Sequence, residues 1–92
     1  MIISFRDKGL ASFHLTGKKA GIQAKHAERI RLILARLQAS GEPRDMNLPG
    51  LKLHALTGNY EGFWAVAVSG NWRILFRFVG QDVADVDYLD YH

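Results

Sequence analysis

The sequence predicts an α+β fold in which two N-terminal helices pack on a mainly antiparallel, curved sheet. In the first half of the 92 residues, apolar side chains recur at helical spacing, and from Leu51 onward the period becomes an alternating one. The expected strands follow one another through short turns, so each can pair with the next in antiparallel fashion. A chain of 92 residues encloses one hydrophobic core, and we expect a single domain over residues 1–92.

Two helices are expected in the first half of the chain. The first covers about residues 5–15, because Ser4 and Asp7 have the spacing of a capping box and Gly17 can end the helix. The second covers residues 24–40, where apolar residues recur at helical spacing before a glycine and a proline. The apolar positions of this second helix are Ala27, Ile30, Leu34 and Leu37.

Four strands are expected in the second half, each rich in Val, Phe, Trp or Tyr and bounded by turn residues. They cover residues 51–56, 63–68, 72–79 and 83–91. In the third strand, Arg73 and Arg77 alternate with an apolar row that should face the helices. The two arginines are therefore expected on the open face of the sheet. The apolar row consists of Trp72, Ile74, Phe76 and Phe78.

The charge of the chain is unevenly distributed. All 12 Lys and Arg residues lie within residues 1–80, whereas four of the nine Asp and Glu residues lie within 81–92, so the first segment has a formal charge of +7. This charge favours a polyanionic partner, because binding to phosphates releases counterions. The second helix carries a positive stripe, which is either a solvated helix face or a contact for RNA or a protein partner. The stripe consists of Lys25, Arg29 and Arg36.

The composition argues against several classes of protein. The absence of cysteine excludes disulfides, thiolate metal sites and cysteine nucleophiles, and it fits a reducing compartment. No apolar run approaches the ~20 residues that span a bilayer, and the first residues lack the pattern of a signal peptide. We therefore expect a soluble, cytoplasmic protein without membrane contact. The four histidines include no His-x-x-x-His pair, so neither a metal site nor a cofactor is expected.

Side chains suited to phosphodiester chemistry share faces of the expected strands. Alternation places His54 with Lys52, and Asp90 with His92. If the strands pair in a suitable register, these groups and the open-face arginines converge. They suit attack by an RNA 2′-hydroxyl on the adjacent phosphate, with histidines as general base and acid and Arg73 stabilising the charged phosphate. In this scheme Asp90 orients an imidazole or stabilises its cation, no metal is required, and DNA is not cleaved.

Structural roles remain open for several of these residues. A histidine at a chain end, such as His92, is often without function. His54 lies beside a turn, where a catalytic role and a role without function are both common. Tyr91 and Tyr88 could stack on bases, although Tyr88 is expected in the core. The other aromatic residues considered are interpreted as structural or as surface residues: Trp64, Trp72, His14 and His26.

Four segments carry a resemblance that extends over essentially the whole chain. They are residues 1–5 (Met-Ile-Ile-Ser-Phe), 52–58 (Lys-Leu-His-Ala-Leu-Thr-Gly), 61–73, which opens with Glu-Gly-Phe-Trp and closes with Asn-Trp-Arg, and 90–92 (Asp-Tyr-His). In these segments the chain resembles the HigB-type toxins of the RelE superfamily, also known as plasmid-maintenance killer proteins. The resemblance implies the α+β fold described above and ribosome-dependent cleavage of mRNA in the decoding site.

The resemblance also implies partners and residue roles. The partners are the ribosome with its mRNA and a HigA-like antitoxin with a helix-turn-helix domain. Toxin and antitoxin together repress their own operon, so operator DNA is contacted only through the antitoxin complex. The family's catalytic histidines correspond to His54 and His92, with Asp90 and Tyr91 beside them and Arg73 as a phosphate contact.

One departure from the family leaves alternatives open. Family members often carry a lysine just after the loop histidine, where this chain has Thr57. The corresponding phosphate contact is then either missing or supplied by Lys52 or Arg77. An inactive descendant kept as a regulatory partner is one alternative reading. A second is a toxin that resembles ParE and inhibits DNA gyrase without cutting RNA; such a toxin has no need of His54 and His92.

Overall fold

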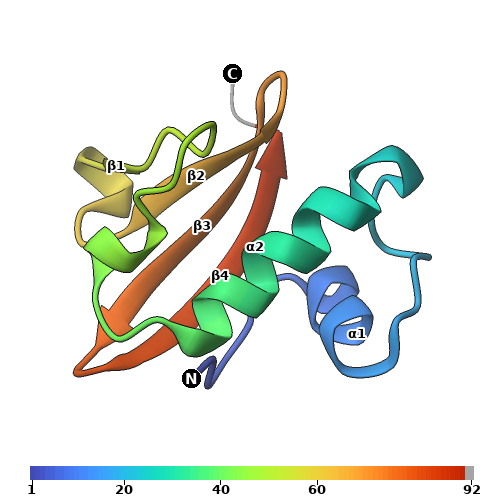
Figure 1. The fold of residues 1–92 in the computed structure, drawn as a ribbon, viewed down its shortest axis with the longest axis horizontal. Helices are drawn as coiled ribbons and strands as arrows, with labels where there is room; N and C mark the ends of the chain where they lie inside the picture. The colour runs from blue at the N-terminus through green and yellow to red at the C-terminus, as the bar shows by residue number, and fades with distance from the viewer. Residues whose placement is uncertain (91–92) are drawn as a thin grey trace.

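The computed structural model describes residues 1–90, which form a two-layer α+β arrangement (Figure 1). Two α-helices in this part of the chain, α1 (Lys8–Thr16) and α2 (Ala27–Ala39), lie on one side of the sheet. The strands of that sheet are β1 (His54–Ala55), β2 (Trp64–Ser69), β3 (Trp72–Val79) and β4 (Asp82–Asp90). They are arranged in the order β1-β2-β3-β4, with antiparallel neighbours. The predicted fold class is confirmed.

The first residues of the chain form the edge of the sheet instead of beginning a helix. Ile2 and Phe5 make parallel bridges with Val83 and Val86 of β4. The backbone of Ser4 also takes part, because its carbonyl accepts a hydrogen bond of 3.2 Å from Val86 N. The outer edge of β4 is therefore covered by the chain's own N-terminal segment.

α1 begins three residues later than predicted, at Lys8. Its cap is Asp7, whose carboxylate accepts a hydrogen bond of 2.7 Å from Leu10 N. The capping role predicted for Ser4 is wrong, since the Ser4 hydroxyl accepts a hydrogen bond of 2.8 Å from Asp85 N. The pairing of the N-terminal segment with β4 uses the residues that the sequence pattern assigned to the first helical turn.

α2 confirms the second predicted helix over 24–40, with its first turn taken by the short 3-10 segment η1 (Ala24–His26). The helix buries one side against the sheet and exposes the other. One departure concerns His26, which was expected on the helix surface but is only 3% exposed. The residues that α2 buries are Ala27, Ile30, Ile33, Leu34 and Leu37.

Two strands depart from the regular pattern. β1 is limited to His54–Ala55, whereas the sequence predicted a strand over 51–56. Lys52 interrupts it, because its φ of 53° is a left-handed conformation that no regular strand contains. Asp85 has the same φ of 53°, at the point where the pairing register between β3 and β4 shifts. This bulge in β4 changes which of its side chains face the helices.

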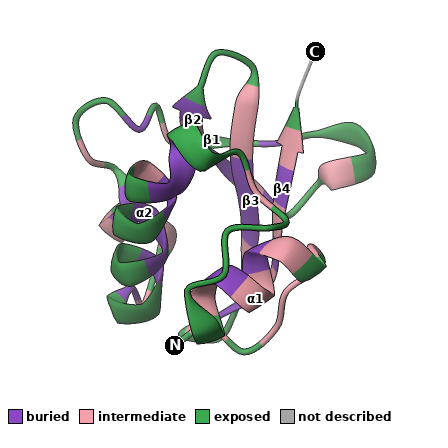
Figure 2. Cartoon of the chain, turned by 90° about the vertical axis from the view of Figure 1, so that its right-hand side faces the viewer, coloured by how far each residue is buried: buried purple, intermediate pink, exposed green. Residues whose placement is uncertain are grey.

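The main core lies between the helices and the sheet face that we call the helix face, which carries Val66, Ile74, Phe76 and Val86. A second, smaller cluster lies on the opposite face, called the outer face, and consists of Leu56, Phe63, Ala65 and Leu75 with Tyr60 and Leu89 packed against it. Figure 2 shows the buried residues along the strands and on one side of α2. The outer face was expected to be open, but residues 56–63 cover its centre, and Leu75 is fully buried.

A close contact between two glycines fixes the loop that joins α1 to α2. A Cβ atom on Gly21 would lie 2.4 Å from the Cα atom of Gly9, well inside contact distance. Only residues without a side chain allow α1 and this loop to approach so closely. The contact holds residues 20–23 against α1.

Candidate active site

The strand register places His54 on the outer face of the sheet. His54 is opposite Ala65, Ala65 is opposite Leu75, and Leu75 is opposite Asp87. Residues directly opposite each other project from the same face, so these four form one row across the sheet. Arg73 is two residues from Leu75 along β3 and therefore shares this face.

His54 is exposed, and its ring is oriented by the backbone. Its Nδ1 atom lies 3.0 Å from the Lys52 carbonyl oxygen, which can only accept a hydrogen bond. Nδ1 therefore carries the proton in this contact, and Nε2 of the neutral ring keeps its lone pair. Lys52, which provides this carbonyl group, is the residue with the left-handed backbone conformation. The arrangement leaves Nε2 as a proton acceptor at the surface.

The two arginines of β3 share the outer face but are held differently. The Arg73 Nη1 atom donates hydrogen bonds of 2.6 Å and 3.0 Å to the carbonyl oxygens of Gly70 and Trp72. These bonds leave the other N–H groups of the guanidinium for an anion. The Arg77 Nε atom donates to the Asp85 carboxylate at 2.6 Å. Arg77 is thus partly neutralised, whereas Arg73 is a cation held on neutral carbonyl groups.

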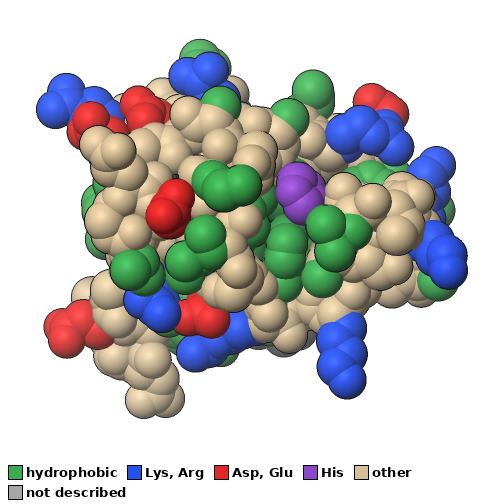
Figure 3. Space-filling model, turned by 90° about the horizontal axis from the view of Figure 1, so that it is seen from below, with side chains coloured by type: hydrophobic (Ala, Val, Ile, Leu, Met, Phe, Trp, Pro, Cys, Tyr) green, Lys and Arg blue, Asp and Glu red, His purple; other side chains and the backbone are tan. Residues whose placement is uncertain are grey.

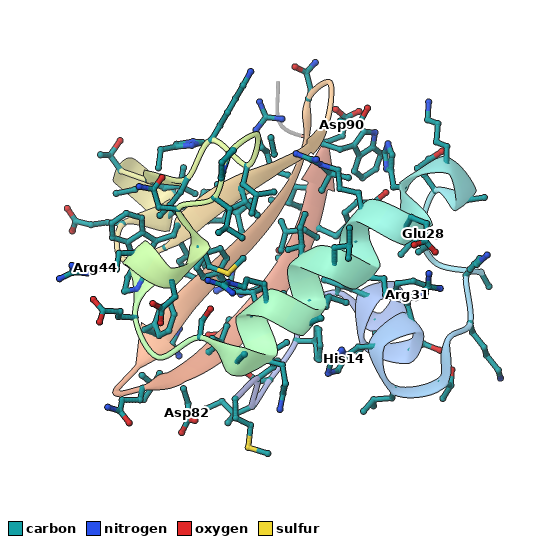
Figure 4. All side chains as sticks on the ribbon, viewed as in Figure 1. His14, Glu28, Arg31, Arg44, Asp82 and Asp90 are labelled. Atoms are coloured by element: carbon teal, nitrogen blue, oxygen red, sulfur yellow. The ribbon has the colours of Figure 1, made fainter. Side chains whose placement is uncertain are left out.

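Asp90 does not lie on the row of His54. It is directly opposite Trp72, whose ring packs against the helix-side core, so Asp90 projects from the helix face. The bulge at Asp85 causes this placement, because it puts Val86, and with it every second residue after it, on the same face as Val83. Figure 4 shows Asp90 at the end of β4, near the hairpin that joins β2 and β3.

Only some of the predicted catalytic groups therefore lie on one face of the sheet. His54 and Arg73 share the outer face, and Asp90 belongs to the other face at the end of the sheet. Tyr91 and His92, which the sequence analysis assigned to the site, lie outside the described residues.

Lys52 and Arg77 were the two candidates for an additional phosphate contact. Lys52 is exposed and lies two residues before His54, while Arg77 is engaged with Asp85. Thr57 is also exposed and lies just before the short 3-10 segment η3 (Gly58–Tyr60). The left-handed φ of Lys52 interrupts the alternation that was expected to place it on the face of His54.

The predicted positive stripe on α2 does not form as a single surface. Arg29 turns toward the sheet, where its guanidinium donates to the carbonyl oxygens of Ala67 and Gly50 at 3.2 Å and 2.7 Å. Arg36 is exposed but donates to the Asp45 carbonyl at 3.1 Å. Lys25 is exposed and belongs to η1, before α2 begins. On the face shown in Figure 3, Lys and Arg side chains lie mostly at separate places around the rim.

A buried polar cluster supports the end of the sheet from the helix side. His26 Nδ1 lies 2.7 Å from the Tyr88 hydroxyl, and the Tyr88 ring stacks on Trp72 with centroids 4.5 Å apart. His26 Nε2 is buried and has no hydrogen-bond partner within residues 1–90. Burial lowers the pKa of His26, and the positive charge of Lys25 lowers it further. Both effects favour the neutral form of the imidazole in the folded chain.

Two residues of the outer face were not singled out by the sequence analysis. The Arg6 guanidinium lies over the Phe63 ring, 5.0 Å from its centroid. Asp87 is half-buried at the end of the His54 row, and its carboxylate accepts a hydrogen bond of 2.9 Å from Tyr88 N. No local sequence signal marks either residue, because Arg6 is placed by the pairing of the N-terminal segment with β4, and Asp87 by the register between β3 and β4.

The part of the chain that the structure describes contains no group of three or more His, Asp or Glu side chains arranged to hold a metal ion. Among these same residues, no helix is long and apolar enough to cross a membrane.

Fold and sequence together define the class of protein. A family model for RelE-like toxins, described as the toxin HigB of type II toxin-antitoxin systems, matches residues 3–92. The chain therefore belongs to this family of toxins, and the resemblance predicted from its sequence is confirmed. A toxin of such a system has an antitoxin as its partner.

The chain is also similar to a particular member of the family. It is 38% identical to Endoribonuclease HigB of Proteus vulgaris over 92 residues, and the match covers 100% of both chains.

Proposed function

We propose that this toxin is an endoribonuclease that cuts mRNA on the ribosome, in the decoding site, and thereby inhibits translation. The observation that carries the proposal is the exposed His54, whose ring is oriented by the Lys52 carbonyl so that Nε2 faces away as a proton acceptor. The name of the Proteus vulgaris relative, Endoribonuclease HigB, supports the endoribonuclease part of this proposal.

In the proposed reaction, the 2′-oxygen of the RNA attacks the adjacent phosphorus and the bond to the 5′-oxygen breaks. His54 Nε2 accepts the proton of the 2′-hydroxyl, and His92 donates a proton to the departing 5′-oxygen. Arg73 stabilises the negative charge that develops on the phosphate. The products are a 2′,3′-cyclic phosphate and a 5′-hydroxyl group, and no metal or cofactor takes part.

Asp90 and Tyr91 are proposed to assist the reaction. Asp90 is close in sequence to His92, and its carboxylate would stabilise the protonated imidazole of that residue. Lys52 would supply the phosphate contact that family members with a lysine near position 57 make from that position.

Dependence on the ribosome follows from the way in which the site is built. Attack by the 2′-hydroxyl requires in-line geometry, and a small exposed site of this kind does little to impose it on a flexible RNA. We propose that the ribosome holds the mRNA in that geometry. The basic side chains of residues 1–80 would dock on ribosomal RNA, and this binding should weaken steeply with added salt.

The proposed antitoxin is a HigA-like protein with a helix-turn-helix domain. In this proposal the toxin reaches operator DNA only through that antitoxin. We place the reaction in the cytoplasm, where ribosomes and mRNA are found.

The proposal is tested by mapping mRNA 5′ ends by primer extension in a cell-free translation reaction, with and without ribosomes. The wild-type chain should produce new ends at in-frame positions only when ribosomes are present. His54→Ala and His92→Gln should each abolish these ends.

His14→Gln is the matched control, because His14 belongs to α1, far from Asp90 (Figure 4). It should cut as the wild type does. If the wild-type chain produces no new ends, the nuclease proposal fails, and a gyrase supercoiling assay then tests the ParE-like alternative.

A further inference from the structure

A concave feature lies where β3 begins and β4 ends. It is a cavity of about 320 Å³ on the helix side of the sheet. Its walls come from Asp7 at the start of α1, from loop residues 20–23, and from Trp72 and Tyr88. The volume is at the lower end of the range for small-molecule pockets, and a single nucleobase is a ligand of suitable size.

One wall of the cavity is aromatic and fixed in place. The stacked rings of Trp72 and Tyr88 form it, and the Tyr88 hydroxyl is held by His26 Nδ1 at 2.7 Å and by Gln23 N at 3.3 Å. Trp72 is only half-buried, so part of its indole is accessible from the cavity. An aromatic surface that is already positioned can stack on an unpaired RNA base with little loss of conformational entropy.

The same cavity contains a carboxylate. One oxygen of Asp7 accepts the hydrogen bond from Leu10 N that caps α1, which fixes the side chain. Burial raises the pKa of Tyr88, and the negative charge of Asp7 adds to this effect, in keeping with a carboxylate close to the phenol. A carboxylate accepts hydrogen bonds and donates none, so it favours a base edge rich in N–H donors. Guanine presents two adjacent donors, N1–H and the exocyclic amino group.

Basic residues flank the cavity along the chain. Lys18 and Lys19 directly precede loop residues 20–23, Lys25 follows them, and all three lysines are exposed. The loop cannot shift freely, because Gly21 is packed against Gly9. Ammonium groups beside a base pocket are suited to contact the phosphates on either side of the bound nucleotide.

The cavity adjoins the candidate active site across the end of the sheet. Trp72 is opposite Asp90 in the register, and the next residue of β3 is Arg73, on the outer face. An RNA chain that passes around this end of the sheet would place neighbouring nucleotides on the two faces.

We propose that the cavity of Asp7, residues 20–23, Trp72 and Tyr88 is a base-binding subsite that takes a guanine of single-stranded RNA next to the cleaved phosphodiester. This inference rests on the proposed function, because it requires RNA as the substrate. The aromatic wall stacks on the base, Asp7 accepts from its Watson–Crick edge, and the lysines contact the flanking phosphates.

The test measures binding without cleavage, with trinucleotides that carry 2′-O-methyl groups and cannot be attacked. NMR titration of the wild-type chain with U-G-U, U-A-U, U-C-U and U-U-U follows the Trp72 indole N–H and the amides of residues 20–23. U-G-U should shift these signals and bind at least about threefold more tightly than U-U-U, the smallest margin that we would accept as a preference.

Three variants locate the binding. Ala20→Phe fills the cavity and should weaken U-G-U binding about tenfold, whereas Ala39→Phe, an equal change at the exposed end of α2, should leave it unchanged. Asp7→Asn keeps a good helix cap and should remove only the preference for guanine. This last variant remains informative even if Ala20→Phe does not fold.

Two results would overturn the subsite. The first is U-G-U binding that is equal in the wild type and in Ala20→Phe, since the base would then lie elsewhere. The second is guanosine 5′-monophosphate binding as tightly as U-G-U, which would make the cavity a site for a free nucleotide. If the chain cuts mRNA but U-G-U does not shift these signals, the subsite fails and the proposed function stands.

Discussion

The two faces of the sheet hold their polar side chains in opposite ways. On the helix face, His26 and Tyr88 are buried and fixed by each other, by the stacked Trp72 ring and by the backbone of Gln23. On the outer face, His54 is exposed and its ring is held by one contact to a carbonyl oxygen. A buried cluster stabilises the fold, whereas an exposed and weakly held imidazole can meet a substrate. Substitutions on the two faces should therefore separate stability from activity.

The largest effect on activity is expected at His54. His54→Ala should lower the rate of ribosome-dependent mRNA cleavage on the order of 10²–10⁴-fold, the range that a general acid or base contributes. Because His54 is exposed, the midpoint of thermal unfolding should stay within about 2 °C of the wild-type value. Cleavage rates and calorimetry on the same preparation check both parts. A large drop in the unfolding midpoint would place His54 among the structural residues.

The largest effect on stability is expected on the helix face. Phe76 is fully buried in the main core, and Phe76→Ala should lower the free energy of unfolding by about 3–5 kcal/mol. Val79, in the same strand, is 47% exposed, so Val79→Ala should cost less than about 0.5 kcal/mol. Urea denaturation of the two variants measures this difference. Equal losses would contradict the position of the core between the helices and the sheet.

The two arginines of the outer face provide a comparison within one strand. Arg73→Ala should lower the cleavage rate on the order of 10²-fold, because a donor to the developing charge is lost. Arg77→Ala should change the rate by less than about threefold, since Arg77 is engaged with Asp85. The free energy of unfolding should fall by at most about 1 kcal/mol in Arg77→Ala, because the ion pair is partly exposed. A stronger loss of cleavage in Arg77→Ala than in Arg73→Ala would reverse the assignment.

The smallest effect is a dependence of stability on pH that originates at His26. Burial lowers the pKa of this imidazole below its ordinary value of 6.5, so the unfolded chain binds the proton more readily than the folded chain. The contribution of His26 to stability is therefore fully present above about pH 6.5 and is lost as the pH falls toward the lowered pKa. In the His26→Gln variant, the side chain at position 26 does not titrate in this pH range. The variant's free energy of unfolding, measured from pH 8 to pH 5, should decline less than that of the wild type.

The sequence predicted the elements whose signal is local. Helical spacing located α2, and the alternation in the third strand correctly placed Ile74 and Phe76 toward the helices and Arg73 toward the outer face. The resemblance carried by residues 1–5, 52–58, 61–73 and 90–92 identified the family, which the match over residues 3–92 confirms.

Features that depend on contacts between distant segments were not predictable. His26 is buried beside Tyr88, a residue 62 positions later in the chain, and the two side chains share a hydrogen bond. The bulge at Asp85 is bound to Ser4, 81 positions earlier, and it alone explains why Asp90 leaves the face of His54. Arg29 was read as a surface cation, yet the carbonyl oxygens it contacts belong to other segments of the chain.

The central claim is that His54 and Arg73 on the outer face support attack by the 2′-hydroxyl of mRNA. The most direct measurement uses a ribosome-bound mRNA in which the nucleotide before the mapped cut carries 2′-hydrogen in place of the 2′-hydroxyl. We predict that the unmodified mRNA yields a fragment ending in a 2′,3′-cyclic phosphate, identified by mass spectrometry, and that the 2′-deoxy mRNA is not cut at that position. Cleavage of the 2′-deoxy mRNA at the same position, or a product without the cyclic phosphate, would contradict the account.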